Sequence, residues 1–167
     1  MQTILVFFGM TASGKSTLGQ AYAEKHRLPY YNTDRTRKEL VGLKPTDKRP
    51  DGIDQGIYTP ELTAKTYGEM LRLTAQDLQA GAVAVVLDGS YSKVEDRQHV
   101  LQAARQIKAR AFFIYCFCDE QEVLRRFNLR NQDPQAVSDG RLEIYHHQCK
   151  SFERPGELTE EQLLLFE

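Results

Sequence analysis

The sequence has few of the features that mark secreted, membrane-spanning or strongly charged proteins. Its 167 residues include three cysteines, no tryptophan and a net charge of −1. Three cysteines are too few for a disulfide scaffold and fit a reducing cytosol. No apolar run reaches the length of a membrane-spanning helix, and residues 4–8 are too short an apolar stretch for a secretory signal. We therefore expect a cytoplasmic protein with no membrane association and no obligate protein partner.

The composition is that of an ordinary globular protein, and the length fits one domain over residues 1–167. Strand-like and helix-like stretches alternate, which predicts an α/β fold with a mostly parallel, five-stranded sheet. The expected strands are 3–8, 28–32, 82–87, 111–118 and 163–166, the last with a helix end as the alternative. The expected helices are 16–26, 34–41, 60–80, 92–108, 120–131 and 136–152, with an irregular stretch over 42–59.

Residues 9–16, Gly-Met-Thr-Ala-Ser-Gly-Lys-Ser, match the Gly-x4-Gly-Lys-Ser pattern of a phosphate-binding loop. The glycines allow backbone N–H groups to face a phosphate chain at the start of the next helix. Lys15 would reach the β- and γ-phosphates, and Ser16 would give its hydroxyl to Mg²⁺. The alternative is a strand-to-helix turn with a surface lysine. The residues predicted to bind ATP are Gly9, Thr11, Ala12, Ser13, Gly14, Lys15, Ser16 and Thr17.

Two acidic residues are expected beside this loop, where the carboxyl ends of parallel strands meet. Asp34 follows the second strand and is placed to accept the proton of an attacking hydroxyl, with a helix N-cap as the alternative role. Arg37, three residues on, would grip an anionic group of the acceptor. Asp88 follows the third strand and would support the magnesium site from behind or contact the acceptor, unless it is a turn residue.

Two features bear on what receives the phosphate. Asp88 has no acidic neighbour in the sequence, whereas hydrolytic ATPases usually have one, so transfer to a hydroxyl is favoured over transfer to water. Residues 34–49 carry a local charge of +3, which is either a solvated basic face or a contact for an anionic acceptor such as a nucleic-acid end.

Arginines also mark a predicted helical lid over residues 120–152. Arg126 and Arg130 are four residues apart on one helix, just before the helix break at Asp133 and Pro134. Such a lid would bring the arginines against the charge that develops between the phosphates. The alternative is a surface helix in which Glu122 pairs with Arg126.

The loop, the Asp34–Arg37 pair, Asp88 and the lid arginines together resemble the phosphate-loop kinases of the polynucleotide-kinase-like group. That group includes zeta toxins, chloramphenicol phosphotransferase and gluconate kinase. Residues 32–40 and 56–61 are similar to the signature of its predicted kinases. The resemblance implies a three-layer αβα P-loop NTPase fold, Asp34 as general base, Arg37 as acceptor clamp, and Arg126 and Arg130 as lid residues on ATP.

We therefore expect an ATP- and Mg²⁺-dependent kinase that transfers the γ-phosphoryl group to an acceptor hydroxyl. The 5′-hydroxyl of a polynucleotide or nucleoside is the favoured acceptor, because of the basic stretch. The alternatives are a kinase for a small antibiotic or sugar, and a nucleotide-hydrolysing switch with no phosphorylated acceptor.

Overall fold

A computed structural model describes residues 1–47, 51, 52, 54–130 and 142–167. Its five strands form one sheet in the order β2-β3-β1-β4-β5, and every neighbouring pair is parallel. The strands are β1 (Thr3–Phe8), β2 (Tyr30–Asn32), β3 (Ala84–Gly89), β4 (Arg110–Cys116) and β5 (Leu163–Phe166). The predicted five-stranded sheet is confirmed, and the order of its strands places β1 at the centre.

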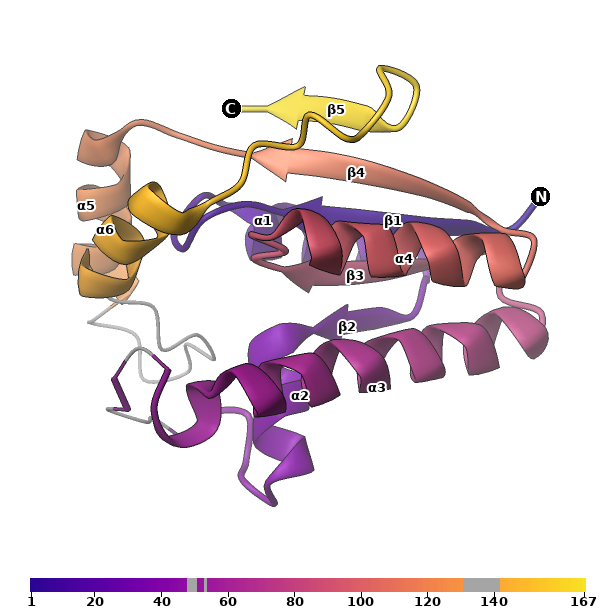
Figure 1. The fold of residues 1–167 in the computed structure, drawn as a ribbon, viewed down its shortest axis with the longest axis horizontal. Helices are drawn as coiled ribbons and strands as arrows, with labels where there is room; N and C mark the ends of the chain where they lie inside the picture. The colour runs from indigo at the N-terminus through magenta and orange to yellow at the C-terminus, as the bar shows by residue number, and fades with distance from the viewer. Residues whose placement is uncertain (48–50, 53, 131–141) are drawn as a thin grey trace.

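The helices complete three layers and the predicted P-loop NTPase fold (Figure 1). One face of the sheet is covered by α1 (Lys15–His26), and the other by α3 (Pro60–Gln79) and α4 (Val94–Gln106). Near the edge strand β2 lie α2 (Thr33–Leu40) and the short 3-10 helix η1 (Gly56–Tyr58). Beyond the carboxyl ends of the strands lie α5 (Glu120–Arg130) and α6 (Leu142–Ser151).

The central strand is apolar on both faces because helices cover both. Phe7 packs towards α1 with Val86 and Ile114, while the alternating residues Val6 and Phe8 belong to the core on the other side. All five are buried. This is why β1 is a continuous apolar run and not an alternating one.

Several strands and helices begin or end a few residues away from their predicted boundaries. β3 begins at Ala84 and runs to Gly89, two residues further than predicted, so Asp88 lies within the strand and is not a turn residue. β2 begins only at Tyr30, after Pro29, whose missing N–H cannot join a ladder. The predicted start of the last helix, Ala136, lies outside the described residues. None of the described helices is long and apolar enough to cross a bilayer.

A buried arginine ties α4 to the segment that follows α6. Arg97 has no solvent exposure, and its guanidinium forms an ion pair with Glu157. It also donates to the Tyr91 carbonyl at 2.7 Å and lies 5.6 Å from the Phe8 ring centroid. One side chain therefore joins α4, the C-terminal segment and the core.

Replacing Arg97 with Met should lower the free energy of unfolding by about 2–4 kcal/mol, because the partly buried Glu157 carboxylate and the Tyr91 carbonyl lose the donor that they share. Urea denaturation measures this loss. Arg105→Met, on an exposed position of the same helix, is the control and should change stability little. Equal midpoints for the two variants would contradict the anchoring role of Arg97.

Candidate active site

The phosphate-binding loop has a backbone conformation that few side chains tolerate. Gly9 and Gly14 have φ values of 145° and 94°, and Ala12 has a φ of 62°. A Cβ on Gly9 would lie 2.1 Å from the Cys116 carbonyl oxygen, so the loop backbone packs directly against the end of β4. Left-handed residues interspersed among ordinary ones turn successive N–H groups to one side, which makes a concave site for an anion.

The helix that follows the loop offers its first turn to the same anion. The N-cap of α1 is Gly14, which has no side chain to cap the helix, and no acidic residue lies in the first turn. The N–H groups at this end therefore lack a side-chain acceptor, and the helix dipole adds positive potential. Such an N-terminus is a binding site for a phosphate or another anion.

The side chains of the loop divide into buried and accessible ones. Thr11, Ala12 and Ser13 are buried, and the Ser13 hydroxyl has no hydrogen-bond partner among the described residues. Lys15 donates to the Met10 carbonyl at 3.2 Å, so its ammonium group lies across the loop. Thr11, Lys15 and Ser16 line a cavity of about 140 Å³, whereas Thr17 is exposed and does not line it.

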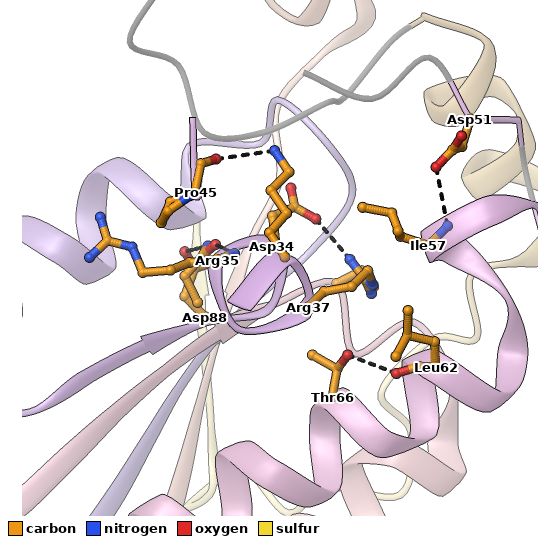
Figure 2. Close-up of polar contacts among 12 residues, drawn as sticks. Asp34, Arg35, Arg37, Pro45, Asp51, Ile57, Leu62, Thr66 and Asp88 are labelled. Carbon is orange, nitrogen blue, oxygen red and sulfur yellow. Dashed lines mark hydrogen bonds and ion pairs between the residues drawn. The ribbon is translucent and has the colours of Figure 1, made fainter. Parts of the chain in front are cut away.

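Asp34 and Arg37 also line this cavity. Arg37 donates to Asp34 Oδ1 at 2.9 Å, and Figure 2 shows the two side chains facing each other. Among the described residues Asp34 Oδ2 has no hydrogen-bond partner. The structure therefore brings together the phosphate loop and the predicted base. The alternative role of Asp34 as a helix cap is wrong, because Asn32 caps α2 by accepting from the Arg35 amide at 3.0 Å.

Arg37 is a buried side chain fixed by its neighbours, and not an exposed one on the protein surface. Only 7% of the residue is exposed, and its guanidinium lies 4.8 Å from the centroid of the Tyr58 ring. Its Nε is buried with no hydrogen-bond partner among the described residues. Arg37 thus orients Asp34 and keeps one donor unused.

Asp88 lies beneath the site, in the interior of the sheet. It has no solvent exposure, and its Oδ2 accepts from Tyr30 Oη at 2.5 Å and from Asn32 Nδ2 at 2.6 Å. Burial, reinforced by Asp88, raises the pKa of Tyr30 well above its usual value, so the phenol remains a donor. Asp88 Oδ1 has no partner in the described part of the chain. Since Asp88 does not line the cavity of about 140 Å³, the predicted contact with the acceptor is not supported.

α5 carries Arg126 onto the phosphate loop. Asp119 caps this helix by accepting from the Glu122 amide at 2.8 Å. Arg126 Nη1 donates to the Ala12 carbonyl at 3.0 Å, and a Cβ on Gly14 would lie 3.0 Å from the same nitrogen. Hydrogen bonds from Arg125 and Arg126 lower the pKa of Glu122 to about 2, so this carboxylate stays charged and orients Arg126 at neutral pH. Arg130 ends α5, and its side chain lies outside what the structure describes.

The structure adds a residue that sequence reasoning missed. Gln148 of α6 accepts a hydrogen bond from the Thr11 amide at 2.7 Å and lines the cavity with Ile144. Nothing in the local sequence distinguishes Gln148 from other polar residues of an amphipathic helix, since its partner is 137 positions away. Tyr58 was also missed as a site residue, although it lies within the 56–61 motif.

Two of the four described basic residues of 34–49 are buried, so the described part of this stretch is not simply a solvated basic face. Arg37 and Lys38 are both buried, and Lys38 Nζ donates to the Pro45 carbonyl at 3.2 Å. Arg35 and Lys44 are the exposed basic residues in the described part of 34–49. Lys48 and Arg49 lie outside the described residues. The described side chains therefore do not support a phosphate-backbone contact here.

Comparison with protein families adds an independent finding. The model of the AAA domain family matches residues 4–155. The chain belongs to this family. None of the curated proteins matches it significantly. The finer polynucleotide-kinase-like subgroup is not confirmed for this member of the AAA domain family.

Solved kinase structures share the fold of this AAA domain. A gluconokinase from Sinorhizobium meliloti 1021 has a TM-score of 0.64 at 19% identity, and the match covers 98% of this chain and 81% of that chain. A sugar kinase from Janibacter sp. HTCC2649 has a TM-score of 0.65 at 16% identity, over 99% and 84% of the two chains. At these identities the likeness shows the fold alone.

Replacing Arg126 with Ala should weaken ATP binding by roughly tenfold, the effect of losing one charge-assisted hydrogen bond to a phosphate oxygen. Titration with a non-hydrolysable ATP analogue measures the dissociation constant. Arg125→Ala is the matched control, because Arg125 shares the Glu122 partner but makes no contact with the loop in the described structure. Equal affinities of the two variants would remove Arg126 from the nucleotide site.

Proposed function

We propose that the chain is an ATP-dependent kinase that transfers the γ-phosphoryl group to a hydroxyl of a small molecule. One observation carries the proposal. The Asp34 carboxylate lines the same cavity as the phosphate loop residues Thr11, Lys15 and Ser16. A positioned carboxylate beside a phosphate site is what transfer between two substrates requires, and it has no task in binding the nucleotide alone.

The residues present also fit Mg²⁺ beside the phosphates. Ser16 offers a hydroxyl next to the loop lysine, and the buried Asp88 Oδ1 lacks a partner among the described residues. Oxygen donors of this kind are the ligands that Mg²⁺ takes, usually together with water and phosphate. We infer that Ser16 binds the ion directly and that Asp88 acts behind it. When bound, Mg²⁺ neutralises charge on the β- and γ-phosphates.

In the proposed reaction the oxygen of the acceptor hydroxyl forms a bond to the γ-phosphorus, and Asp34 takes the proton of that hydroxyl. The bond between the γ-phosphorus and the β–γ bridging oxygen breaks, and ADP leaves. Arg37 holds the Asp34 carboxylate in place through the 2.9 Å ion pair. Lys15 and Arg126 provide the positive charge that favours a transition state rich in negative charge. We predict the same role for Arg130.

Two observations favour a small acceptor over a nucleic acid. The basic residues Arg37 and Lys38 are buried and cannot follow a phosphate backbone. In addition, the similar structures that share this fold are named as a gluconokinase and a sugar kinase. The small-molecule kinase, an alternative in the sequence analysis, is therefore the interpretation that we adopt.

Replacing Asp34 with Asn should lower kcat by about 10²- to 10⁴-fold, because the amide cannot accept the proton. ATP affinity should be unchanged, since Asp34 faces the acceptor side. Transfer of label from γ-³²P-ATP to sugars, sugar acids, aminoglycosides, nucleosides and 5′-hydroxyl oligonucleotides gives the rate and identifies the acceptor.

Glu39→Gln, on an exposed position of the same helix, controls for the loss of one negative charge and should retain full activity. If Asp34→Asn retained transfer to the best acceptor, the role of Asp34 as base would be refuted. If instead only phosphate release were detected with every compound, the chain would be a hydrolytic switch.

A further inference from the structure

A second, larger hollow opens directly from the phosphate cavity. It has a volume of about 990 Å³ and is lined mainly by residues of α3 and α4. The two hollows have five lining residues in common, namely Arg37, Tyr58, Ser90, Ile144 and Gln148. A molecule whose hydroxyl reaches Asp34 can therefore extend into this groove, which we call the α3–α4 groove.

The α3 wall of the groove contains a glycine that the fold itself does not require. Gly68 lies inside a 20-residue helix, where glycine is less stable than alanine by about 1 kcal/mol. Its φ is not positive, and a Cβ built on it would meet no atom within 4 Å. Neither backbone conformation nor packing explains the missing side chain. Its effect is to keep the groove wide, together with Ala64 and Ala75 on the same flank.

An unsatisfied donor at the inner end of the groove indicates independently that a ligand binds there. Arg37 is more than nine-tenths buried, and its Nε has no hydrogen-bond partner among the described residues. A buried donor without a partner costs about 1–3 kcal/mol, and more when it is charged. An acceptor atom of a bound molecule would remove this cost.

The charges of the groove select against anions. Its described lining holds the carboxylates of Asp54, Glu95 and Asp96. Two of its cations, Arg37 and Arg72, are already paired with Asp34 and Glu69. Lys93 is the remaining lysine or arginine of the described lining. Polyanions would therefore meet repulsion along the groove, whereas neutral or amine-bearing molecules would not.

The walls are suited to a polar compound that also has apolar faces. The α3 side presents small apolar residues with Leu71, while the α4 side presents His99, Gln102 and Gln106. The volume lies at the upper end of the range for pockets that hold drug-sized ligands, so a single small ring would leave most of it empty.

We infer that the α3–α4 groove binds the distal part of the acceptor, and that this acceptor is a polyhydroxylated compound of two or three sugar rings that is uncharged or carries amino groups. This inference rests on the proposed kinase function. The hydroxyl to be phosphorylated lies at Asp34, the Arg37 Nε–H donates to an oxygen of the same ring, and the remaining rings lie between the two helices beside Gly68.

Gly68→Leu tests the groove by filling it. Binding of maltotriose and of kanamycin, measured by calorimetry, should weaken by at least about tenfold because the added side chain occupies their place. The affinity for ATP should be unchanged, and the urea midpoint should not fall because leucine is a better helix former than glycine. Lys65→Leu, an exposed position of α3 outside the groove lining, is the matched control and should affect neither ligand.

A second variant tests the charge selection. Asp96→Asn should weaken the binding of kanamycin and leave that of maltotriose unchanged. Gluconate and a 5′-hydroxyl dinucleotide are the anionic comparison probes. The inference is overturned if wild-type protein binds neither maltotriose nor kanamycin, if Gly68→Leu binds them as wild type does, or if an anionic probe binds more tightly than both.

These outcomes separate the groove from the kinase activity. If the wild type phosphorylates only small or anionic acceptors and Asp34→Asn abolishes that transfer, the kinase function stands and the groove inference fails. If maltotriose or kanamycin binds in a Gly68-dependent way but no label is transferred to any hydroxyl, the groove is a binding site and the kinase function fails.

Discussion

The site depends on one backbone constraint, the left-handed turns of the phosphate loop between β1 and α1. Gly9 must lack a side chain because the Cys116 carbonyl lies where its Cβ would be. Gly14 must adopt a φ of 94° and leaves α1 without a side-chain cap. The N–H groups of the first turn of α1 therefore have no side-chain acceptor within the described fold, so that a phosphate chain can bind them. The surrounding side chains can contribute to phosphate binding only because the loop backbone has these left-handed turns.

Unsatisfied polar atoms gather around that loop. Of the four buried side-chain atoms without a partner in the described structure, three lie at or beside the site, namely Ser13 Oγ, Arg37 Nε and Asp88 Oδ1. Native proteins rarely leave such groups unpaired, because each costs stability. Their concentration at one edge of the sheet supports the proposal that a nucleotide binds on the loop side and an acceptor on the side of Arg37.

Hydrogen bonds and an ion pair connect α6 and the segment that follows it to the α3–α4 groove. Gln148 joins α6 to the Thr11 amide, and the chain just after α6 returns to α4, where Glu153 accepts from the Val94 amide at 2.6 Å. The ion pair between Arg97 and Glu157 holds the same segment. Because α4 also forms one wall of the α3–α4 groove, the helix that contacts the phosphate loop is anchored to the wall that faces the proposed acceptor.

Local patterns were enough to predict the parallel sheet, the phosphate loop and the place of Asp34 just after a strand. Each depends on residues close together in the chain, or on an edge that all parallel strands share. The tertiary structure alone decided that Lys38 is buried and that Gln148 contacts Thr11, whereas the cap of α2 by Asn32 is a local contact that the sequence analysis missed. Burial and contacts between distant segments follow from how helices pack on the sheet, and a charge count over 34–49 carries no information about that packing.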